Sequence, residues 1–89
     1  MGNMLPPIDN SLELVAREIV DSALKVHQTL GPGLLESVYE TCLCHELSKR
    51  GVPCVRQIPV NIAYDDLQIE AGLRIDVLVA NSIVVELKP

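Results

Sequence analysis

The stretch GLRIDVLVANSIVVELK, residues 72–88, decides the fold, because it contains two apolar runs joined by a short polar turn. LRIDVLVA covers residues 73–80, and IVVELK covers residues 83–88. Apolar runs bounded by turn-forming residues such as Asn81 and Ser82 are typical of neighbouring strands in an antiparallel sheet. The sequence therefore predicts two strands here, with Gly72 interrupting the first of them.

Three charged residues in these strands are candidates for chemistry. Asp76 lies inside a run that otherwise predicts burial, while Glu86 and Lys88 are two positions apart and so share one face of a strand. Carboxylate oxygens, together with a backbone carbonyl such as that of Leu87, are ligands that Mg²⁺ prefers. A lysine beside the metal could orient or deprotonate the attacking water, or stabilise developing charge. The competing interpretation is an ordinary solvated Glu–Lys pair on a strand.

The length of the turn tests whether these residues can share a site. A strict two-residue turn would pair Ala80 with Ile83 and set Asp76 opposite Leu87, on the other face from Glu86. A shared metal therefore requires an odd-numbered loop or a bulge, either of which would bring Asp76 across from Glu86 or Lys88.

Two helices are predicted upstream of the strands. Residues 11–30 follow a capping-box arrangement of Asn10 and Glu13, and GPG at 31–33 ends the helical pattern. The second helix is predicted over residues 34–50 and ends before Gly51. The residues predicted to face inward recur at helical spacing: Leu12, Ala16, Ile19, Ala23, Val26 and Leu30 in the first helix, and Leu35, Val38, Tyr39, Cys42, Leu43 and Leu47 in the second.

After Pro53 the pattern changes to period two. Ile58, Val60 and Ile62 alternate with more polar residues, which predicts a strand, and Asp65-Asp66 predicts the turn after it. The fold class is therefore α+β, with two helices followed by a three-stranded, mainly antiparallel sheet.

Composition limits the classes of function. The net charge of −5 opposes bulk attraction to phosphates, and the 2% aromatic content opposes a base-stacking platform. No apolar run approaches the roughly 20 residues that a membrane-spanning helix needs. The three cysteines are interpreted as reduced thiols of a cytoplasmic protein. A metal site in the Cys-x-Cys-His run at 42–45 is disfavoured, because helical positions 42 and 44 point in different directions.

Two motifs resemble a known family. RID at 74–76, followed by ELK at 86–88, resembles the PD-(D/E)xK nuclease superfamily. More narrowly, GPGLLESVYE at 31–40 resembles the prokaryotic GxxExxY family through Gly33, Glu36 and Tyr39. His27, Gln57 and Tyr64 also stand where this family would have them. The resemblance covers nearly all of the chain from Ser11 onward.

The resemblance implies a restriction-endonuclease-like core of the order αβββαβ and a set of site residues. Asp76 and Glu86 would be metal ligands for Mg²⁺ or Mn²⁺, with the Leu87 carbonyl as an additional ligand. Lys88 would be the catalytic lysine, Glu36 the helix carboxylate that completes the site, and Tyr39 and Gln57 supporting residues. The residues themselves leave alternatives open: a solvent-facing acid at Glu36, a core ring at Tyr39, and a buried structural histidine at His27.

The expected organisation is an extended leader over residues 1–10 and a truncated nuclease-like domain over residues 11–89. The chain stops at Pro89, before the last helix and strand that the resemblance implies. The exposed sheet that this would leave favours a homo-oligomer, most simply a dimer. We expect a metal-dependent nuclease that acts on nucleic acid. It is expected to be cytoplasmic and not associated with a membrane. The alternative is a catalytically inactive interaction or dimerisation domain, which the negative charge, the few aromatics and the early stop favour.

Overall fold

The computed structural model of the chain describes residues 10–87. Its order is α1 (Asn10–Leu30), α2 (Glu36–Lys49), β1 (Cys54–Tyr64), β2 (Leu67–Val79) and β3 (Ile83–Val85). The strands form one antiparallel sheet in the order β1-β2-β3. This confirms the predicted α+β fold and the three strands. The third strand ends at Val85, earlier than predicted, and Lys88 lies outside the described residues.

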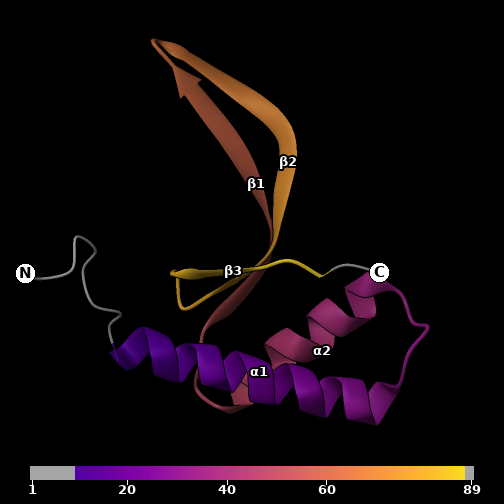
Figure 1. Ribbon diagram of the computed structural model, residues 1–89. Coiled ribbons are helices and arrows are strands. Elements are labelled where there is room, and N and C mark those ends of the chain that lie inside the picture. The colour runs from indigo at the N-terminus through magenta and orange to yellow at the C-terminus, as the bar shows by residue number, and fades with distance from the viewer. Residues whose placement is uncertain (1–9, 88–89) are drawn as a thin grey trace, which may run out of the picture.

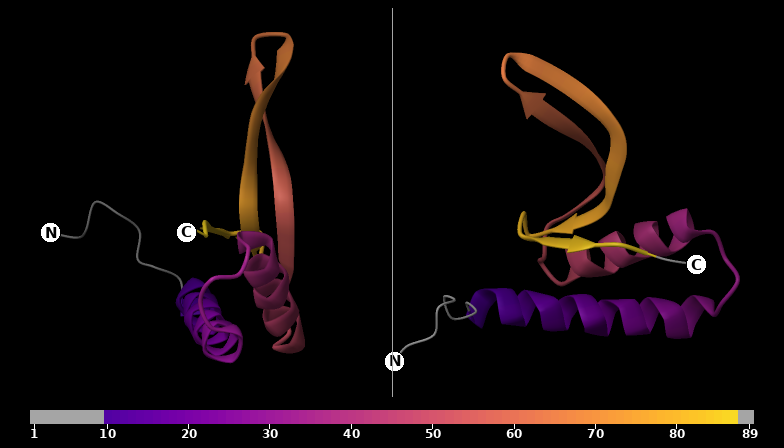
Figure 2. Two further views of the ribbon diagram at one scale, coloured as in Figure 1. Left: turned by 90° about the vertical axis from the view of Figure 1, so that its right-hand side faces the viewer. Right: turned by 45° about the horizontal axis from the view of Figure 1, so that its top comes forward.

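Both helices lie at one end of the long β1–β2 hairpin (Figure 1). They run side by side and are joined by the loop at residues 31–35, and β3 crosses the base of the hairpin close to them (Figure 2). The far end of the hairpin projects away from the helices. The helices therefore cover only the base of the sheet.

Two glycines end the helices by adopting the left-handed conformation. Gly31 has a φ of 72°, and its N–H donates to the carbonyl of His27 at 2.8 Å. Gly51 has a φ of 78°, and the Val52 N–H after it donates to the Leu47 carbonyl at 2.9 Å. The second arrangement is a Schellman motif, which turns the chain sharply from α2 toward β1.

The core lies between α2 and the base of β2. Leu43 and Leu47 of α2 pack against Val77 and Val79 of β2, and Val15 and Ile19 of α1 border this cluster. Burial of Leu43 and Leu47 confirms their predicted inward position. The predicted inward positions of Leu35, Val38, Leu12, Ala16 and Ala23 are wrong, because these residues are exposed.

The hairpin contains the predicted irregularity at Gly72. The register pairs Val60 with Leu73 but Asn61 with Glu70, so β2 contains two extra residues at this point. Gly72, with a φ of 70°, is one of them. Beyond the bulge, the cross-strand pairs Ile62–Ile69 and Tyr64–Leu67 expose large apolar side chains.

The expectation of three reduced thiols is wrong for two of them. Cys44 of α2 and Cys54 of β1 form a disulfide, while Cys42 is free. The turn at Gly51 brings the end of α2 beside the start of β1, so that the two Cα atoms are 5.4 Å apart, within the ordinary range for a disulfide. The bond adds a covalent tie between helix and sheet.

Candidate active site

The loop between β2 and β3 has three residues, Ala80, Asn81 and Ser82, instead of the two expected at the turn. Val79 pairs with Ile83, and Val77 pairs with Val85. Ala80 and Asn81 are both left-handed, with φ values of 52° and 54°. The odd loop length is the condition under which Asp76 and Glu86 can share a face. Continuing the register by one residue brings Glu86 opposite Asp76.

The alternation of the strand places Asp76 on the sheet face that points away from α2, and the same alternation continued past the end of β3 would place Glu86 there as well. Val77, Val79 and Val85 face the helical core, and neighbouring positions of a strand alternate between faces. Asp76 is half-buried and Glu86 is exposed. One Asp76 oxygen, Oδ2, accepts a hydrogen bond from the Leu87 N–H at 3.3 Å. This bond holds the segment after β3 beside β2.

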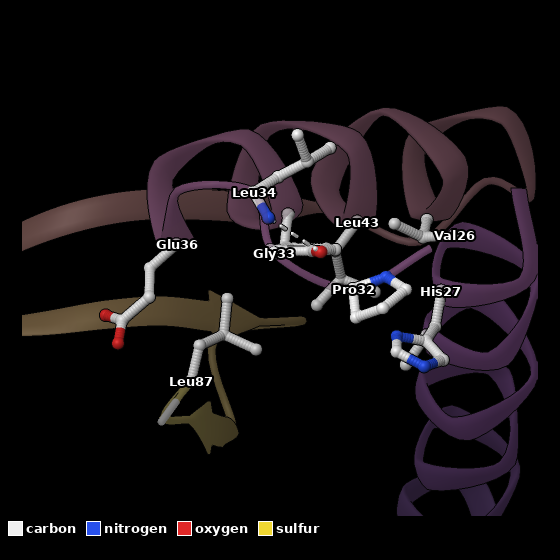
Figure 3. A pocket seen from close by; sticks show the side chains of 10 residues that line it. Val26, His27, Pro32, Gly33, Leu34, Glu36, Leu43 and Leu87 are labelled. Carbon is white, nitrogen blue, oxygen red and sulfur yellow. Dashed lines mark hydrogen bonds between the residues drawn. The ribbon is translucent and has the colours of Figure 1, made fainter. Parts of the chain in front are cut away.

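The side chain of Leu87 lies on the opposite, helical side, in a pocket of about 550 Å³. The pocket is lined by Ala23, Val26, His27, Pro32, Gly33, Leu34, Glu36, Tyr39, Leu43 and Leu87. Glu36 and His27 stand toward opposite ends of this pocket, with Leu87 and Pro32 between them in the view of Figure 3. The pocket thus joins the GPG loop and the first turn of α2 to the residue that follows Glu86.

Glu36 is exposed at the first position of α2. The geometry does not gather it with Asp76 and Glu86 into one cluster: within residues 10–87 no group of three His, Cys, Asp or Glu side chains could hold a metal ion together. His27 is exposed at the pocket wall, so the expectation of a buried structural histidine is wrong. It lies in the last turn of α1, and Figure 3 shows its ring at one end of the pocket.

Tyr39 fastens the loop between the two helices. Its hydroxyl donates to the Gly31 carbonyl and accepts from the Leu34 N–H, the latter at 3.2 Å. The ring is partly buried, with its hydroxyl at the edge, as the alternative interpretation of this residue expected. Tyr39 therefore fixes the backbone that leads into Glu36.

Gln57 is bound to a carboxylate that sequence reasoning missed. Glu40 is only 3% exposed, and its Oε1 accepts from Gln57 Nε2 at 2.8 Å and from Arg56 Nη2 at 3.3 Å. Gln57 has a left-handed φ of 55°. The available signal was the position of Glu40 on the same stripe of α2 as Leu43 and Leu47, where an unpaired acid would be costly to bury.

A second missed carboxylate belongs to the helix–helix contact. Glu46 is buried and binds Lys25 of α1 at 3.0 Å and Arg50 at 3.4 Å. The hydrogen bond from Lys25 is the main reason that the pKa of Glu46 lies below its usual range. Arg50 also binds Glu18 at 3.0 Å, and this bond raises the pKa of the guanidinium. These ion pairs join α1 to α2 and are distant in sequence from the candidate site residues of the strands.

Comparison with known proteins gave one family. The family model described as PD-(D/E)XK nuclease superfamily matches residues 13–89. Comparisons with curated proteins and with solved structures gave no match. In the part of the chain that the structure describes, no helix is long and apolar enough to cross a membrane.

Proposed function

We propose a function from the premise that this chain belongs to the PD-(D/E)XK nuclease superfamily: hydrolysis of phosphodiester bonds in nucleic acid, dependent on Mg²⁺ or Mn²⁺. The observation that carries the proposal is the three-residue loop, whose register leads Glu86 to a position opposite Asp76. Side chains directly opposite in an antiparallel pair have Cβ atoms roughly 5 Å apart. Two carboxylates at this separation suit one small cation.

The residues at this position fit a magnesium site. Mg²⁺ takes oxygen ligands, commonly one or two carboxylates with several waters. Asp76 and Glu86 supply the carboxylates, and the Leu87 carbonyl is a third candidate. The hydrogen bond from the Leu87 N–H occupies only one of the two Asp76 oxygens. A bound divalent cation lowers the pKa of water and offsets negative charge on the phosphate.

The remaining residues have proposed roles around this pair. Lys88 is the catalytic lysine, which orients the attacking water or stabilises the charge that develops on the phosphate oxygens. Glu36 keeps the role of the helix carboxylate that the resemblance implies, although in this structure it lines the pocket beside Leu87 and is not clustered with Asp76 and Glu86. Tyr39 supports Glu36 through the loop that its hydroxyl fastens. Gln57 supports Asp76 from β1.

We further propose membership of the GxxExxY family, a domain that begins near residue 11, a cytoplasmic location in a prokaryote, and a homo-oligomer. Self-association is supported by the uncovered end of the hairpin, where Ile62, Tyr64, Leu67 and Ile69 expose apolar side chains. The same surface supports the second candidate function, a protein-interaction or dimerisation domain without catalysis. The net charge of −5 also favours that alternative, since it opposes binding to phosphates.

A nuclease assay on the full chain decides between the two functions. Single- and double-stranded DNA and single-stranded RNA are incubated with the wild type, Lys88→Ala, Asp76→Ala and the control Asp66→Ala, in Mg²⁺, Mn²⁺ or EDTA. Asp66 is a matched control, because it is an exposed acid in the distant β1–β2 turn. We expect cleavage that EDTA abolishes, that falls at least about 100-fold in Lys88→Ala and Asp76→Ala, and that persists in Asp66→Ala.

Equal cleavage by the wild type and Lys88→Ala would assign the activity to something other than this site. A second measurement concerns the metal alone. Binding of Mn²⁺ to the folded state should raise the melting temperature of the wild type and of Asp66→Ala but not of Asp76→Ala. A rise of the same size in Asp76→Ala would contradict the proposed ligand set.

A further inference from the structure

A buried carboxylate of α2 is bonded to the strand position that faces Asp76. Glu40 is 3% exposed, and burying a charged carboxylate is unfavourable unless hydrogen bonds and opposite charge compensate it. Here the compensation comes from β1, through the Gln57 amide at 2.8 Å and the Arg56 guanidinium at 3.3 Å. Glu40 is therefore anchored on adjacent residues of one strand.

Gln57 adopts a conformation that a residue with a side chain seldom takes. Its φ is 55°, in the left-handed region that is unfavourable for residues other than glycine. Such conformations persist where surrounding contacts compensate them, and they concentrate at functional sites. The hydrogen bond to Glu40 is the contact that compensates Gln57.

The sheet register gives this position its importance. Arg56 pairs with Val77 and Ile58 pairs with Ile75, so Gln57 lies opposite Asp76. The register of β2 with β3 leads Glu86 to the other side of Asp76. Gln57 and Asp76 therefore occupy one level of the sheet, and Glu86, the residue after β3, would join that level if the register continued by one residue.

Glu40 also lies one helical turn after Glu36 on α2. The contact between Glu40 and Gln57 consequently links the helix that carries Glu36 to the level of the sheet that carries Asp76 and Glu86. The other connections of α2 to the sheet are the Cys44–Cys54 disulfide and the apolar core at Leu43 and Leu47.

We propose that Glu40 is a positioning residue that acts through Gln57: the hydrogen bond between them holds Gln57 in its left-handed conformation opposite Asp76 and thereby fixes the Asp76 carboxylate relative to the segment after β3. This proposal adds a positioning residue to the proposed nuclease function. Its relevance to catalysis rests on that function. The geometric part, the orientation of Asp76, is independent of any metal. It is reported by the hydrogen bond that Asp76 accepts from the Leu87 N–H.

The first test therefore uses the metal-free protein and the amide of Leu87, followed by NMR. Glu40→Gln removes the charge with almost no change of shape, and Gln57→Gly removes the amide while permitting the left-handed backbone. Glu46→Gln is the matched control, since Glu46 is also a buried, hydrogen-bonded acid of α2, but its partners Lys25 and Arg50 lie on the helices. We expect Leu87 amide exchange to accelerate at least about 10-fold in Glu40→Gln and Gln57→Gly, and to stay within about twofold of wild type in Glu46→Gln.

The second test measures the Mn²⁺ dissociation constant at a temperature where circular dichroism shows every variant to be folded. Loss of a residue that orients a metal ligand weakens binding by about 10–100-fold, and we expect this range for both Glu40→Gln and Gln57→Gly. Because the two residues act as a unit, the double variant should be no more than about threefold weaker than either single variant. Glu46→Gln should bind as the wild type does.

The outcomes separate the two proposals. An unchanged rate of Leu87 amide exchange in both Glu40→Gln and Gln57→Gly would overturn the positioning role of Glu40, regardless of the Mn²⁺ dissociation constants of these variants. Accelerated Leu87 exchange together with equal Mn²⁺ binding by the wild type and Asp76→Ala would support the positioning of Asp76 and refute the proposed metal site.

Discussion

Removal of the disulfide between Cys44 and Cys54 should lower the free energy of unfolding by about 2.7 kcal/mol at about 25 °C. The two cysteines are 10 residues apart in sequence. The disulfide stabilises the folded state by lowering the conformational entropy of the unfolded chain, and the value follows from the loss of entropy when a loop of that length is closed. A domain of 89 residues is typically stable by only about 4–13 kcal/mol, so the loss is a large fraction of the total. In a domain of this size it corresponds to a fall in melting temperature of roughly 10–20 °C.

The assay is urea unfolding in oxidising buffer of the wild type, of Cys44→Ala/Cys54→Ala, and of Cys42→Ala. Cys42 is the matched control, because it is the free cysteine on the same helix. The double variant should unfold at lower urea than Cys42→Ala, and a thiol reductant should shift the wild type toward the double variant while leaving the double variant itself unchanged. Equal midpoints for the wild type with and without reductant, together with three reactive thiols in the unfolded wild type before reduction, would refute the reasoning.

Two further predictions concern the packing of α2. Leu47→Ala removes a side chain that is 0% exposed in the core and should lower the free energy of unfolding by about 2–5 kcal/mol. The control Leu35→Ala removes a side chain that is 75% exposed and should change the free energy of unfolding by less than about 0.5 kcal/mol. Similar urea midpoints for the two variants would contradict the observed packing. The hydrogen bond from Lys25 lowers the pKa of Glu46 in the folded state. The stability that the ionised Glu46 contributes is therefore fully present above the unfolded pKa of this group and is lost as the pH falls through its folded pKa. Urea midpoints measured from about pH 7 down to about pH 3 should therefore fall less steeply for Glu46→Gln than for the wild type, and parallel curves would show that the ion pair is not formed.

The strands and the faces of their residues followed from local pattern. Period-two alternation places Glu86 on the opposite face from Leu87, and it predicts that Asp76 meets Glu86 only if the loop is odd-numbered. The loop length itself could not be read from the residues. It depends on a left-handed Ala80, a conformation that alanine seldom adopts and that no turn motif signals.

The contacts between α2 and β1 lay beyond sequence reasoning for a different physical reason. The Cys44–Cys54 disulfide and the Glu40–Gln57 hydrogen bond both join a helix to a strand, and their formation depends on how the chain turns at Gly51. A helical pattern gives the face on which Glu40 lies but not the partner that meets it. The resemblance supplied Gln57 as a supporting residue, and only the fold supplied its partner.

The long β1–β2 hairpin divides the molecule into two parts of unequal local stability. At its base, β2 packs against α2 through Val77 and Val79, whereas beyond the bulge at Gly72 the strands are held mainly by pairing with one another. An isolated two-stranded ribbon is at best marginally stable in water. We therefore expect local opening of the outer part, residues 61–70, to require less free energy than opening of the base, to which the level of the sheet that carries Asp76 belongs. A change of shape at the end of the hairpin should therefore leave the packing of the base, and with it the position of Asp76, in place.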